Sequence, residues 1–384
     1  MSEILEQNKD WIAAVWNKVD QKMKKIAVKD YDKIPYTSIN GIHDDQKDNL
    51  YGWTNGFWGG LMWLLYVGTK DENYKKTALH SGTYVDKGLD HYEPLYHDVG
   101  FISHILHGAN YRLTGDMEAK NKNLFMAAAL ASRFNIDGKF IRAWNMDFAE
   151  GWSIIDCMMN LPLLYWASEE IGDPRFKRIA MAHADMTLRD HIREDGAINH
   201  IVVHDTETGE PVKFYTDMGY DQGYNAEGCW SRGLSWAIYG MAISYVHTGK
   251  KEYLNAAKKT ANYFLSHAAA TGYKTLCDFC QPAEPVYYDS TAGVCAACGM
   301  IEISRHVSKA EAEVYLSGAL NLLKATDENF CDYSDQQDAL VLMGTEAYPN
   351  DEKRLKGVHI PIIYGDFFFV EALLKLQNID FLIW

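Results

Sequence analysis

The sequence has no long apolar run, no segment rich in proline or serine, and little positive charge. Its 37 lysines and arginines are outnumbered by 52 aspartates and glutamates, which gives a formal net charge of −15. Nucleic acids and anionic membranes both require a basic face, so neither is expected as a partner. No apolar stretch approaches the roughly 20 residues of a membrane span. The start of the chain lacks the basic and then apolar order of a signal peptide, so none is expected.

Cysteines and linkers are also informative. Seven cysteines in 384 residues is an odd count, which fits a reducing cytoplasm better than a disulfide framework. We therefore expect a cytoplasmic protein. With 47% hydrophobic and 13% aromatic residues, the chain can bury a large core. Because linker segments are absent, the sequence predicts one domain over residues 1–384.

One pattern recurs along the chain: an apolar helix, a turn with glycine and charged residues, and then an amphipathic helix. The turns lie around Gly68, Gly115, Gly172 and Gly249, where glycine can supply a left-handed helix cap. The apolar helices read GFWGGLMWLLY, GFISHILHGANY, GWSIIDCMMNLPLLYWA, CWSRGLSWAIYGMAISYV, STAGVCAACGMIEIS and YGDFFFVEALLKL. Helices that are apolar all round are buried. Six of them alternating with amphipathic partners predict an all-α fold, an (α/α)6 barrel; an irregular bundle or a solenoid is the alternative.

The main interruption of this pattern lies between the third and fourth helix pairs. The segment AINHIVVHDTETGEPVKFYT alternates in polarity and turns at Thr206–Glu210, which predicts a small β-hairpin insertion. The hairpin leads into DMGYDQGYNAEG, which is too polar and too rich in glycine for a core segment. Long loops of this kind in compact domains are often functional.

Asp156 lies in the third apolar helix, where nearly every neighbour is apolar. Loss of hydration disfavours an ionised carboxylate and raises its pKa, which suits a general acid near neutral pH. The alternative is a structural aspartate bonded to backbone or to an arginine. Asn160, one turn later, is a candidate hydrogen-bond partner for Asp156. Pro162 is expected to bend this helix or to mark a frayed turn.

Asp98 stands in LYHDVGFISHIL, immediately before the second apolar helix. An N-cap role explains it simply, because an aspartate there accepts hydrogen bonds from the first free N–H groups. The cap role is compatible with a catalytic one, since residues at the rim of a helical barrel point toward the central cavity. His97 beside it adds a titratable group.

Arg232 and Trp236 are four residues apart on the fourth apolar helix and therefore share a face. An arginine on an apolar helix requires an anionic partner, either an internal carboxylate or a bound ligand. Gln222 precedes them in the polar loop, and Trp53 and Trp144 begin or flank other apolar helices. Indole rings stack on the C–H faces of sugars, and polar groups bind the hydroxyls. Any single tryptophan is more often part of a core than a platform for sugars, so the prediction of a sugar site depends on several lying at the same ends of neighbouring helices.

Two C-x-x-C pairs have nearly the spacing of a zinc ribbon; they are formed by Cys277, Cys280, Cys295 and Cys298. The second pair lies in a helix of small residues, where cysteine often acts as a compact apolar group. We predict no metal and no other cofactor, with structural zinc on these cysteines as the alternative.

The sequence resembles the unsaturated glucuronyl hydrolases of glycoside hydrolase family 88. The similar motifs occur in the order of that family from about residue 50 onward. They are WTNGFWGG, HDVGF, IIDCMMNLPLLYWAS, QGYNAEGCWSRGLSWAIYG, DSTAGVCAACG and IYGDFFFVEALL. The resemblance implies an (α/α)6 barrel whose substrates are unsaturated glycosaminoglycan disaccharides released by polysaccharide lyases.

The reaction implied by this resemblance is hydration of the vinyl ether of a terminal 4,5-unsaturated uronic acid. Asp156 matches the family's general acid and base, which protonates C4 and then helps water to add at C5. The hemiketal so formed collapses and releases the neighbouring sugar. Asp98 matches a second aspartate that holds the hydroxyls of the sugar ring. By the same matching, the substrate site is lined by His97, His204, Gln222, Arg232, Trp53, Trp144 and Trp236.

Two other functions remain open from the sequence. One is an unsaturated galacturonyl or rhamnogalacturonyl hydrolase on the same fold, and the other is a non-catalytic toroid that binds oligosaccharides. The expected partner is a small anionic oligosaccharide, and the protein is expected to be a monomer or a weak homodimer. The sequence motifs select neither a linkage nor a sulfation pattern of the substrate.

Overall fold

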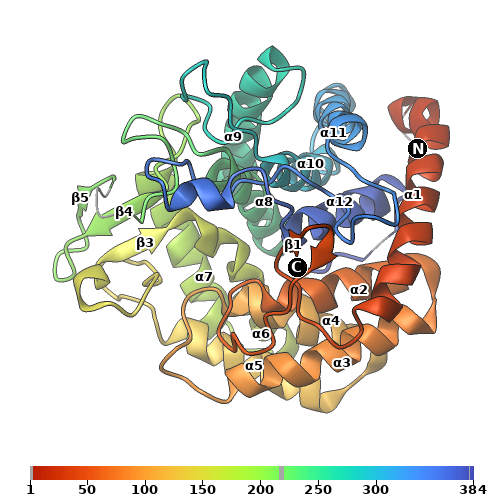
Figure 1. Cartoon of the computed structure of the whole chain (residues 1–384). Coiled ribbons are helices and arrows are strands. Elements are labelled where there is room, and N and C mark those ends of the chain that lie inside the picture. The colour runs from red at the N-terminus through yellow and green to blue at the C-terminus, as the bar shows by residue number, and fades with distance from the viewer. Residues whose placement is uncertain (1–2, 216–219, 380) are drawn as a thin grey trace.

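The computed structural model describes residues 3–215, 220–379 and 381–384, and its helices form two concentric rings (Figure 1). The inner ring consists of α2 (Asn55–Thr69), the π-helix η1 (Gly100–Gly108) continued by α4 (Ala109–Thr114), α6 (Leu161–Ile171), α8 (Ser231–Thr248), α10 (Ser290–Ser304) and α12 (Ile363–Leu376). Each contacts the next, and α12 contacts α2, so the inner ring closes. Closure confirms the predicted barrel and excludes an open solenoid.

The outer ring covers the inner one with amphipathic helices. It consists of α1 (Glu3–Lys29), α3 (Glu72–Leu89), α5 (Met117–Ala131), α7 (Arg175–Met186), α9 (Lys251–Ala270) and α11 (Lys309–Asn329). Of these outer helices, α3, α5, α7, α9 and α11 each pack on the inner helix that precedes them in the chain. The remaining outer helix, α1, contacts α12. One cluster of buried apolar side chains extends from Leu5 to Trp384. In the described ranges, no helix is both long and apolar enough to cross a membrane.

Three of the four predicted glycine caps are confirmed. Gly115, Gly172 and Gly249 end α4, α6 and α8 with φ of 77°, 66° and 70°. The prediction for Gly68 is wrong, because α2 continues to Thr69 and Lys70 takes the left-handed position with φ 60°. A Cβ at position 68 would lie 2.6 Å from the ring of Trp16. Gly68 therefore leaves room for the ring of Trp16 against α2, which is a packing role that local sequence does not reveal.

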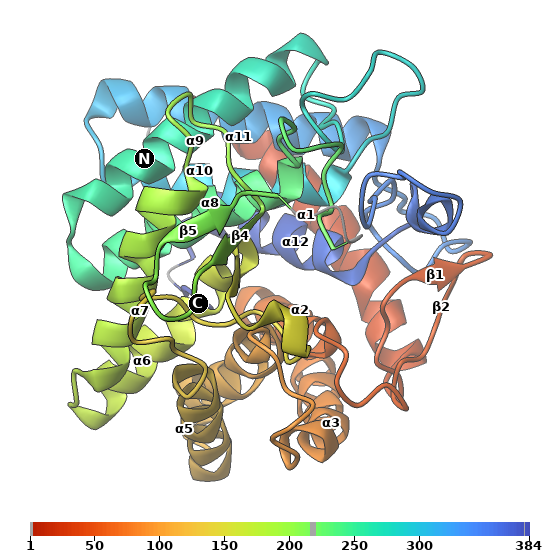
Figure 2. The same cartoon turned by 90° about the vertical axis from the view of Figure 1, so that its left-hand side faces the viewer.

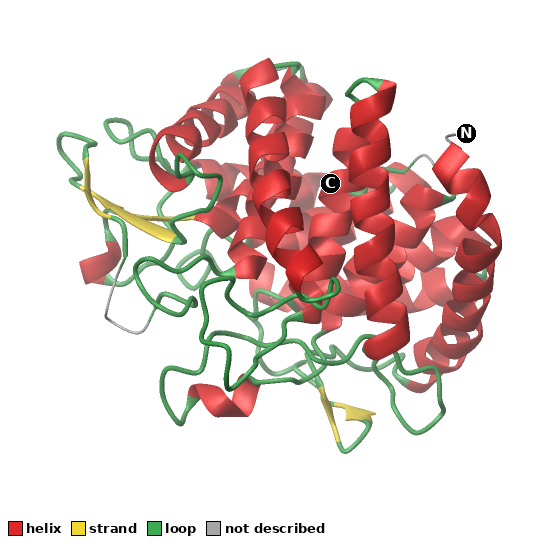
Figure 3. Cartoon of the chain, turned by 90° about the horizontal axis from the view of Figure 1, so that it is seen from above, coloured by secondary structure: helices red, strands yellow, loops and turns green. Residues whose placement is uncertain are grey.

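The strands and long loops gather at one end of the helices (Figure 3). Strands β1 (Ser38–Ile39) and β2 (Ile42–His43) pair with each other, while β3 (Trp152–Ile154), β4 (Ile201–His204) and β5 (Pro211–Lys213) form an antiparallel sheet in the order β3-β4-β5. Figure 2 looks onto β4 and β5, with α8 and α12 behind them. The predicted hairpin is confirmed, and β3 is an additional strand beside it.

The first half of the third apolar segment is not an α-helix. Residues of β3 pair with β4, the 3₁₀ helix η3 (Ile155–Met159) follows, and α6 begins only at Leu161. Pro162 lies in the first turn of α6, where its missing N–H has no helical partner to lose. It therefore starts this helix and does not bend it. Further short helices are η2 (Asp147–Ala149), η4 (Thr187–His191) and η5 (Arg354–Gly357).

The start of η1 and the end of η3 meet at Gly100 and Asn160. The amide Oδ1 of Asn160 accepts a hydrogen bond from the Phe101 N–H at 2.9 Å. A Cβ at position 100 would lie 2.6 Å from Asn160 Oδ1 and 2.7 Å from its Cα. Only glycine fits this approach, which brings the segments carrying Asp98 and Asp156 together.

Replacement of Gly100 by alanine tests this contact. Gly100→Ala should lower the free energy of unfolding by about 1–3 kcal/mol because the added methyl group overpacks the contact. The measurement is urea denaturation followed by circular dichroism. Gly82→Ala in α3 is the matched control, since an added Cβ there meets only His107 Nε2 at 4.0 Å. The control should be neutral or stabilising by about 0.5–1 kcal/mol; equal losses in the two variants would contradict the argument.

Candidate active site

Asp156 lies on η3, directly after β3, and only 9% of its surface is exposed. The N–H of the preceding residue, Ile155, donates to the carbonyl of His200 at 3.0 Å. This bond places the two side chains next to each other, with His200 Nδ1 3.7 Å from Asp156 Oδ1. Within the described residues, neither of these two buried atoms has a hydrogen-bond partner.

Asp98 lies just before η1 and is equally buried, at 9% exposure. Its Oδ1 lies 3.2 Å from His97 Nε2. Its backbone carbonyl accepts from the N–H of Ile102 at 3.1 Å, and Val99 occupies the N-cap position of η1. The contribution of Asp98 to the helix start is thus made by its backbone, and the N-cap explanation of its side chain is wrong.

Asn160 does not pair with the carboxyl of Asp156 as the sequence suggested. Its Nδ2 is 3.4 Å from the backbone carbonyl of Asp156, and its amide also hydrogen-bonds the carboxyl of Asp98. The prediction assumed an α-helix from Gly151 onward, in which residues four apart share a face. The 3₁₀ winding of η3 changes that face.

The hydrogen bonds of the two histidines determine which nitrogen faces each carboxyl. His97 Nδ1 donates to the carbonyl of Ala143 at 2.9 Å, and His200 Nε2 donates to Oε1 of Gln222. Burial lowers the pKa of both histidines to about 3, so both rings are neutral near pH 7. The nitrogen facing Asp98 or Asp156 therefore carries a lone pair, which favours the protonated form of the carboxyl.

Burial raises the pKa of Asp156 to about 8, and the nearby charge of Asp98 adds to this rise. Burial likewise raises the pKa of Asp98 to about 7, although the positive charge of Arg133 opposes it. Arg232 opposes the shift at Asp156. Near neutral pH the pair retains protons that ordinary aspartates would have lost, and this is the property of a general acid.

Arg232 finds its anionic partner inside the protein. Its Nη1 lies 2.7 Å from Asp289 Oδ2 and 2.7 Å from the carbonyl of Thr345. The guanidinium also lies over the rings of Trp230 and Tyr364, at 4.5 and 5.2 Å from their centroids. Of the two partners that the sequence left open, the structure provides the internal carboxylate.

The three predicted tryptophans differ in exposure. Trp53 and Trp144 are partly exposed. Trp53 packs against Tyr364 at 5.2 Å between centroids, and Trp144 and His97 form a T-shaped contact at 6.0 Å between centroids. Trp236 is fully buried beneath Phe101. Trp53 and Trp144 can therefore face a ligand, whereas Trp236 supports the site from below.

His204 is separated from this group. Its Nε2 lies 2.9 Å from Asp190 Oδ2, and its ring stacks on Phe140 at 4.7 Å between centroids. The structure instead brings His200, four residues earlier, to Asp156. Both histidines belong to the predicted hairpin, and its period of two puts them on the same face, so sequence alone could not choose between them. Tyr364, whose buried hydroxyl has no partner among the described residues, was also missed.

The polar loop before α8 contributes to the walls of the site. Residues 217–219 of this loop, and Thr216 at the end of the hairpin segment, lie outside the described ranges. Asp221, Gly223 and Asn225 line a cavity together with His200 and Trp230. Neither Asp156 nor Asp98 lines this small cavity, so the functional role expected for the loop stays a prediction.

The cysteines of the two C-x-x-C pairs do not form a cluster of metal ligands. Cys277, Cys295 and Cys298 are buried, while Cys280 is exposed. Among the residues that the structure describes, the group with metal-like spacing is Asp30, His43 and Asp338. Lys33 and Lys29 already neutralise its two aspartates at 2.9 and 2.7 Å, so this group holds α1, the β1–β2 hairpin and residue 338 together.

The contribution of Asp156 and Asp98 to the stability of the protein should fall as the pH rises from 3.8, the ordinary pKa of aspartate, to about 8. In that window the native state holds protons on Asp156 and Asp98 that the unfolded chain has released, so rising pH favours unfolding. Asp156→Asn removes the titrating group. Relative to wild type, this variant should gain on the order of 2–4 kcal/mol between pH 4 and pH 8, measured by urea denaturation across that range. A difference between the two proteins that does not change with pH would contradict the raised pKa.

Known proteins share this sequence and architecture. Residues 21–290 match Glycosyl Hydrolase Family 88. The chain is 32% identical over 358 residues to an unsaturated glucuronyl hydrolase of Bacillus sp. (strain GL1), covering 90% of this chain and 92% of the relative. It is 31% identical over 350 residues to an unsaturated chondroitin disaccharide hydrolase of Streptococcus pneumoniae (strain ATCC BAA-255 / R6), covering 88% and 86%.

Solved structures agree with this relationship. The crystal structure of the unsaturated glucuronyl hydrolase from Bacillus sp. GL1, described as responsible for the degradation of glycosaminoglycan, superposes with a TM-score of 0.85 at 30% identity, covering 94% of this chain and 97% of that one. An unsaturated glucuronyl hydrolase specific for heparin superposes with a TM-score of 0.86 at 26% identity, covering 96% and 98%. The protein therefore belongs to glycoside hydrolase family 88.

Proposed function

We propose that this protein is an unsaturated glucuronyl hydrolase that acts on unsaturated glycosaminoglycan disaccharides released by polysaccharide lyases. The observation that carries the proposal is the carboxyl of Asp156, which is buried, has a pKa of about 8 and has an Oδ1 without a hydrogen-bond partner among the described residues. A proton held in this way is available to a substrate. The two relatives at 31–32% identity, which are named unsaturated glucuronyl hydrolase and unsaturated chondroitin disaccharide hydrolase, support this proposal.

The chemistry follows from the position of that proton. Asp156 donates it to C4 of the 4,5-unsaturated uronate, and positive charge develops at C5 beside the ring oxygen. The Asp156 carboxylate then takes a proton from water as the water oxygen bonds to C5. The resulting hemiketal opens by cleavage of the C5–O5 bond, which leaves a ketone at C5 and a hemiacetal at C1. The hemiacetal then collapses to an aldehyde and releases the neighbouring sugar as an alcohol. Arg232 favours the ionised form of Asp156 and so assists the first step.

The remaining residues bind and orient the sugar in this proposal. Asp98 holds ring hydroxyls, with His97 beside it, and Trp53 and Trp144 provide flat surfaces for the C–H faces of the sugar. Gln222 acts through His200, whose tautomer it sets. Trp236 and Arg232 support the residues that line the site. His200 has the substrate-site role that the sequence analysis assigned to His204.

We further propose a single catalytic domain over residues 1–384, because one apolar core cluster includes helices of the whole ring. We also propose that the reaction takes place in the cytoplasm, and the seven free thiols support a reducing compartment. The partner is a small anionic oligosaccharide, no cofactor is required, and a monomer or weak homodimer remains the expected state.

Asp156→Asn tests the central step. Turnover should fall by about 10²–10⁴-fold because the general acid is lost. The assay follows the ultraviolet absorbance of the conjugated uronate in chondroitin, hyaluronan and heparin disaccharides. Asp366→Asn is the matched control: Asp366 is also buried with a raised pKa, but it accepts hydrogen bonds from the N–H groups of Leu340 and Val341. It should lose stability while the folded fraction keeps its turnover.

Two results would contradict the proposal. Unchanged turnover by Asp156→Asn would remove the assigned acid. Preference of the wild type for a disaccharide from rhamnogalacturonan would replace the substrate class.

The two histidines of the hairpin provide a second test. His200→Ala should lower turnover by about 10²-fold, because the ring that lies beside Asp156 is lost and water can then lower the pKa of its carboxyl. His204→Ala should mainly lower the free energy of unfolding, by about 1–3 kcal/mol, since it leaves the buried Asp190 without this partner. Steady-state kinetics and thermal melting of both variants separate the roles. Equal loss of turnover per folded molecule would contradict the exchange of His204 for His200.

A further inference from the structure

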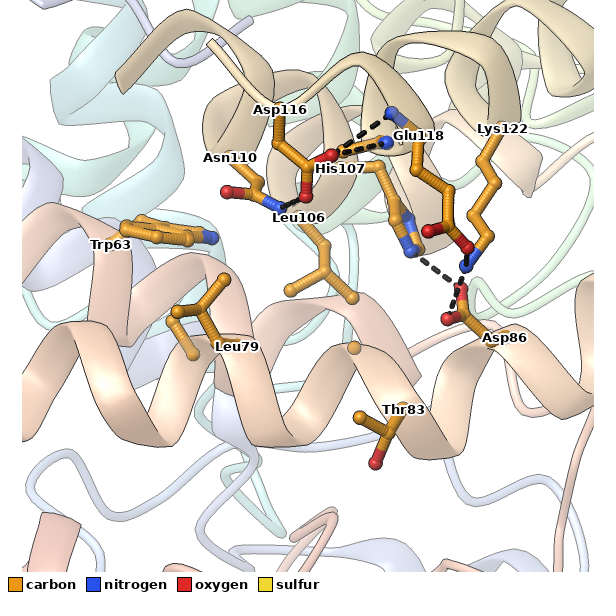
Figure 4. Close-up of a pocket in the computed structure, with 13 residues that line it drawn as sticks. Trp63, Leu79, Thr83, Asp86, Leu106, His107, Asn110, Asp116, Glu118 and Lys122 are labelled. Carbon is orange, nitrogen blue, oxygen red and sulfur yellow. Dashed lines mark hydrogen bonds and ion pairs between the residues drawn. The ribbon is translucent and has the colours of Figure 1, made fainter. Parts of the chain in front are cut away.

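A second cavity lies between α3 and α5, away from the catalytic carboxyls (Figure 4). Its volume is about 260 Å³, just below the range of about 300–1,000 Å³ that holds drug-sized ligands. Trp63 of α2 and His107 of η1 line its inner wall. Position 63 follows the start of α2 at Asn55 by eight residues, or about 12 Å of helix, so the cavity lies well below the ends of α2 and η1 that face the catalytic site.

One buried donor in this cavity has no partner. Trp63 is fully buried, and its indole N–H makes no hydrogen bond within the described residues. Figure 4 shows the nitrogen at the end of the ring that faces the other lining side chains. An unpaired buried N–H is unfavourable by about 1–3 kcal/mol, so an acceptor placed in the cavity would satisfy it.

The opposite side of the cavity is acidic. Asp86, Asp116 and Glu118 line it, with Lys122 as the basic residue. Asp86 pairs with His107 Nε2 at 2.8 Å and with Lys122, and Lys122 also lies 3.2 Å from Glu118. The remaining carboxylate lone pairs accept hydrogen bonds and repel an anion.

These two sides together select the ligand. A simple cation would offer no acceptor to Trp63, and an anion would meet three carboxylates. A hydroxyl group both donates and accepts, so it can satisfy the indole and the carboxylates at once. Leu79 and Leu106 add an apolar surface suited to the C–H groups of a sugar ring. We propose that this cavity binds a neutral monosaccharide at a site separate from the catalytic carboxyls.

The test measures binding of D-glucose and N-acetyl-D-glucosamine by saturation-transfer NMR and calorimetry, with glucuronate as the anionic probe and glucosamine as the cationic one. The wild type should prefer the neutral sugars. Trp63→Phe removes the N–H but keeps a ring and should weaken binding about three- to tenfold. Trp58→Phe is the matched control, because Trp58 is on the same helix, fully buried and equally without a partner, but lies outside the cavity.

A third variant fills the cavity. Gly82 lines it, and a Cβ there meets only His107 Nε2 at 4.0 Å, so Gly82→Met should abolish binding of the neutral sugars while hydrolysis continues. Binding that persists in Gly82→Met, that is unchanged in Trp63→Phe, or that favours either charged probe overturns the proposal, as does absence of binding. The measurement needs no turnover, so a failure of the proposed hydrolase activity would leave its result unaffected.

Discussion

The site depends on two carboxyl groups that are removed from water without receiving a positively charged partner. Asp156 and Asp98 each face a histidine at 3.7 and 3.2 Å, but burial keeps both imidazoles neutral. An ion pair would have lowered the pKa of each carboxyl, whereas a lone pair opposite a carboxyl raises it. Burial raises the pKa of both aspartates, and the bonds from His97 to Ala143 and from His200 to Gln222 determine which ring nitrogen faces each of them.

The barrel creates these surroundings by interrupting its own inner ring. At η1 and η3 the ring departs from regular α-helix, and the two aspartates lie at or beside these departures. Pairing of β3 with β4 brings His200 to Asp156, and the bond from Phe101 to Asn160 joins η1 to η3. The regular helices on either side pack around the two aspartates and exclude water from them. The irregular backbone of η1 and η3 determines where the two carboxyl groups lie.

The acidic cavity between α3 and α5 contains an aspartate that is ionised, in contrast to the protonated aspartates of the catalytic site. Asp86 is also partly withdrawn from water, but His107 and Lys122 donate to it and keep its pKa below the usual value despite burial. Aspartate at the catalytic end thus holds a proton, while aspartate at the other end remains ionised. The difference arises from the number of donors that each receives.

The sequence by itself determined the ring of alternating helices, the hairpin, and the burial of Asp156, because helical periodicity, glycine caps and apolar neighbours are local properties. Tertiary structure alone decided which histidine meets Asp156, that Arg232 binds Asp289, and that Trp236 lies beneath the site. These outcomes depend on strand pairing and on contacts between residues far apart in the chain. The 3₁₀ turn at Asp156 also escaped prediction, since an apolar run of that length is compatible with strand, turn or helix until its neighbours pair with it.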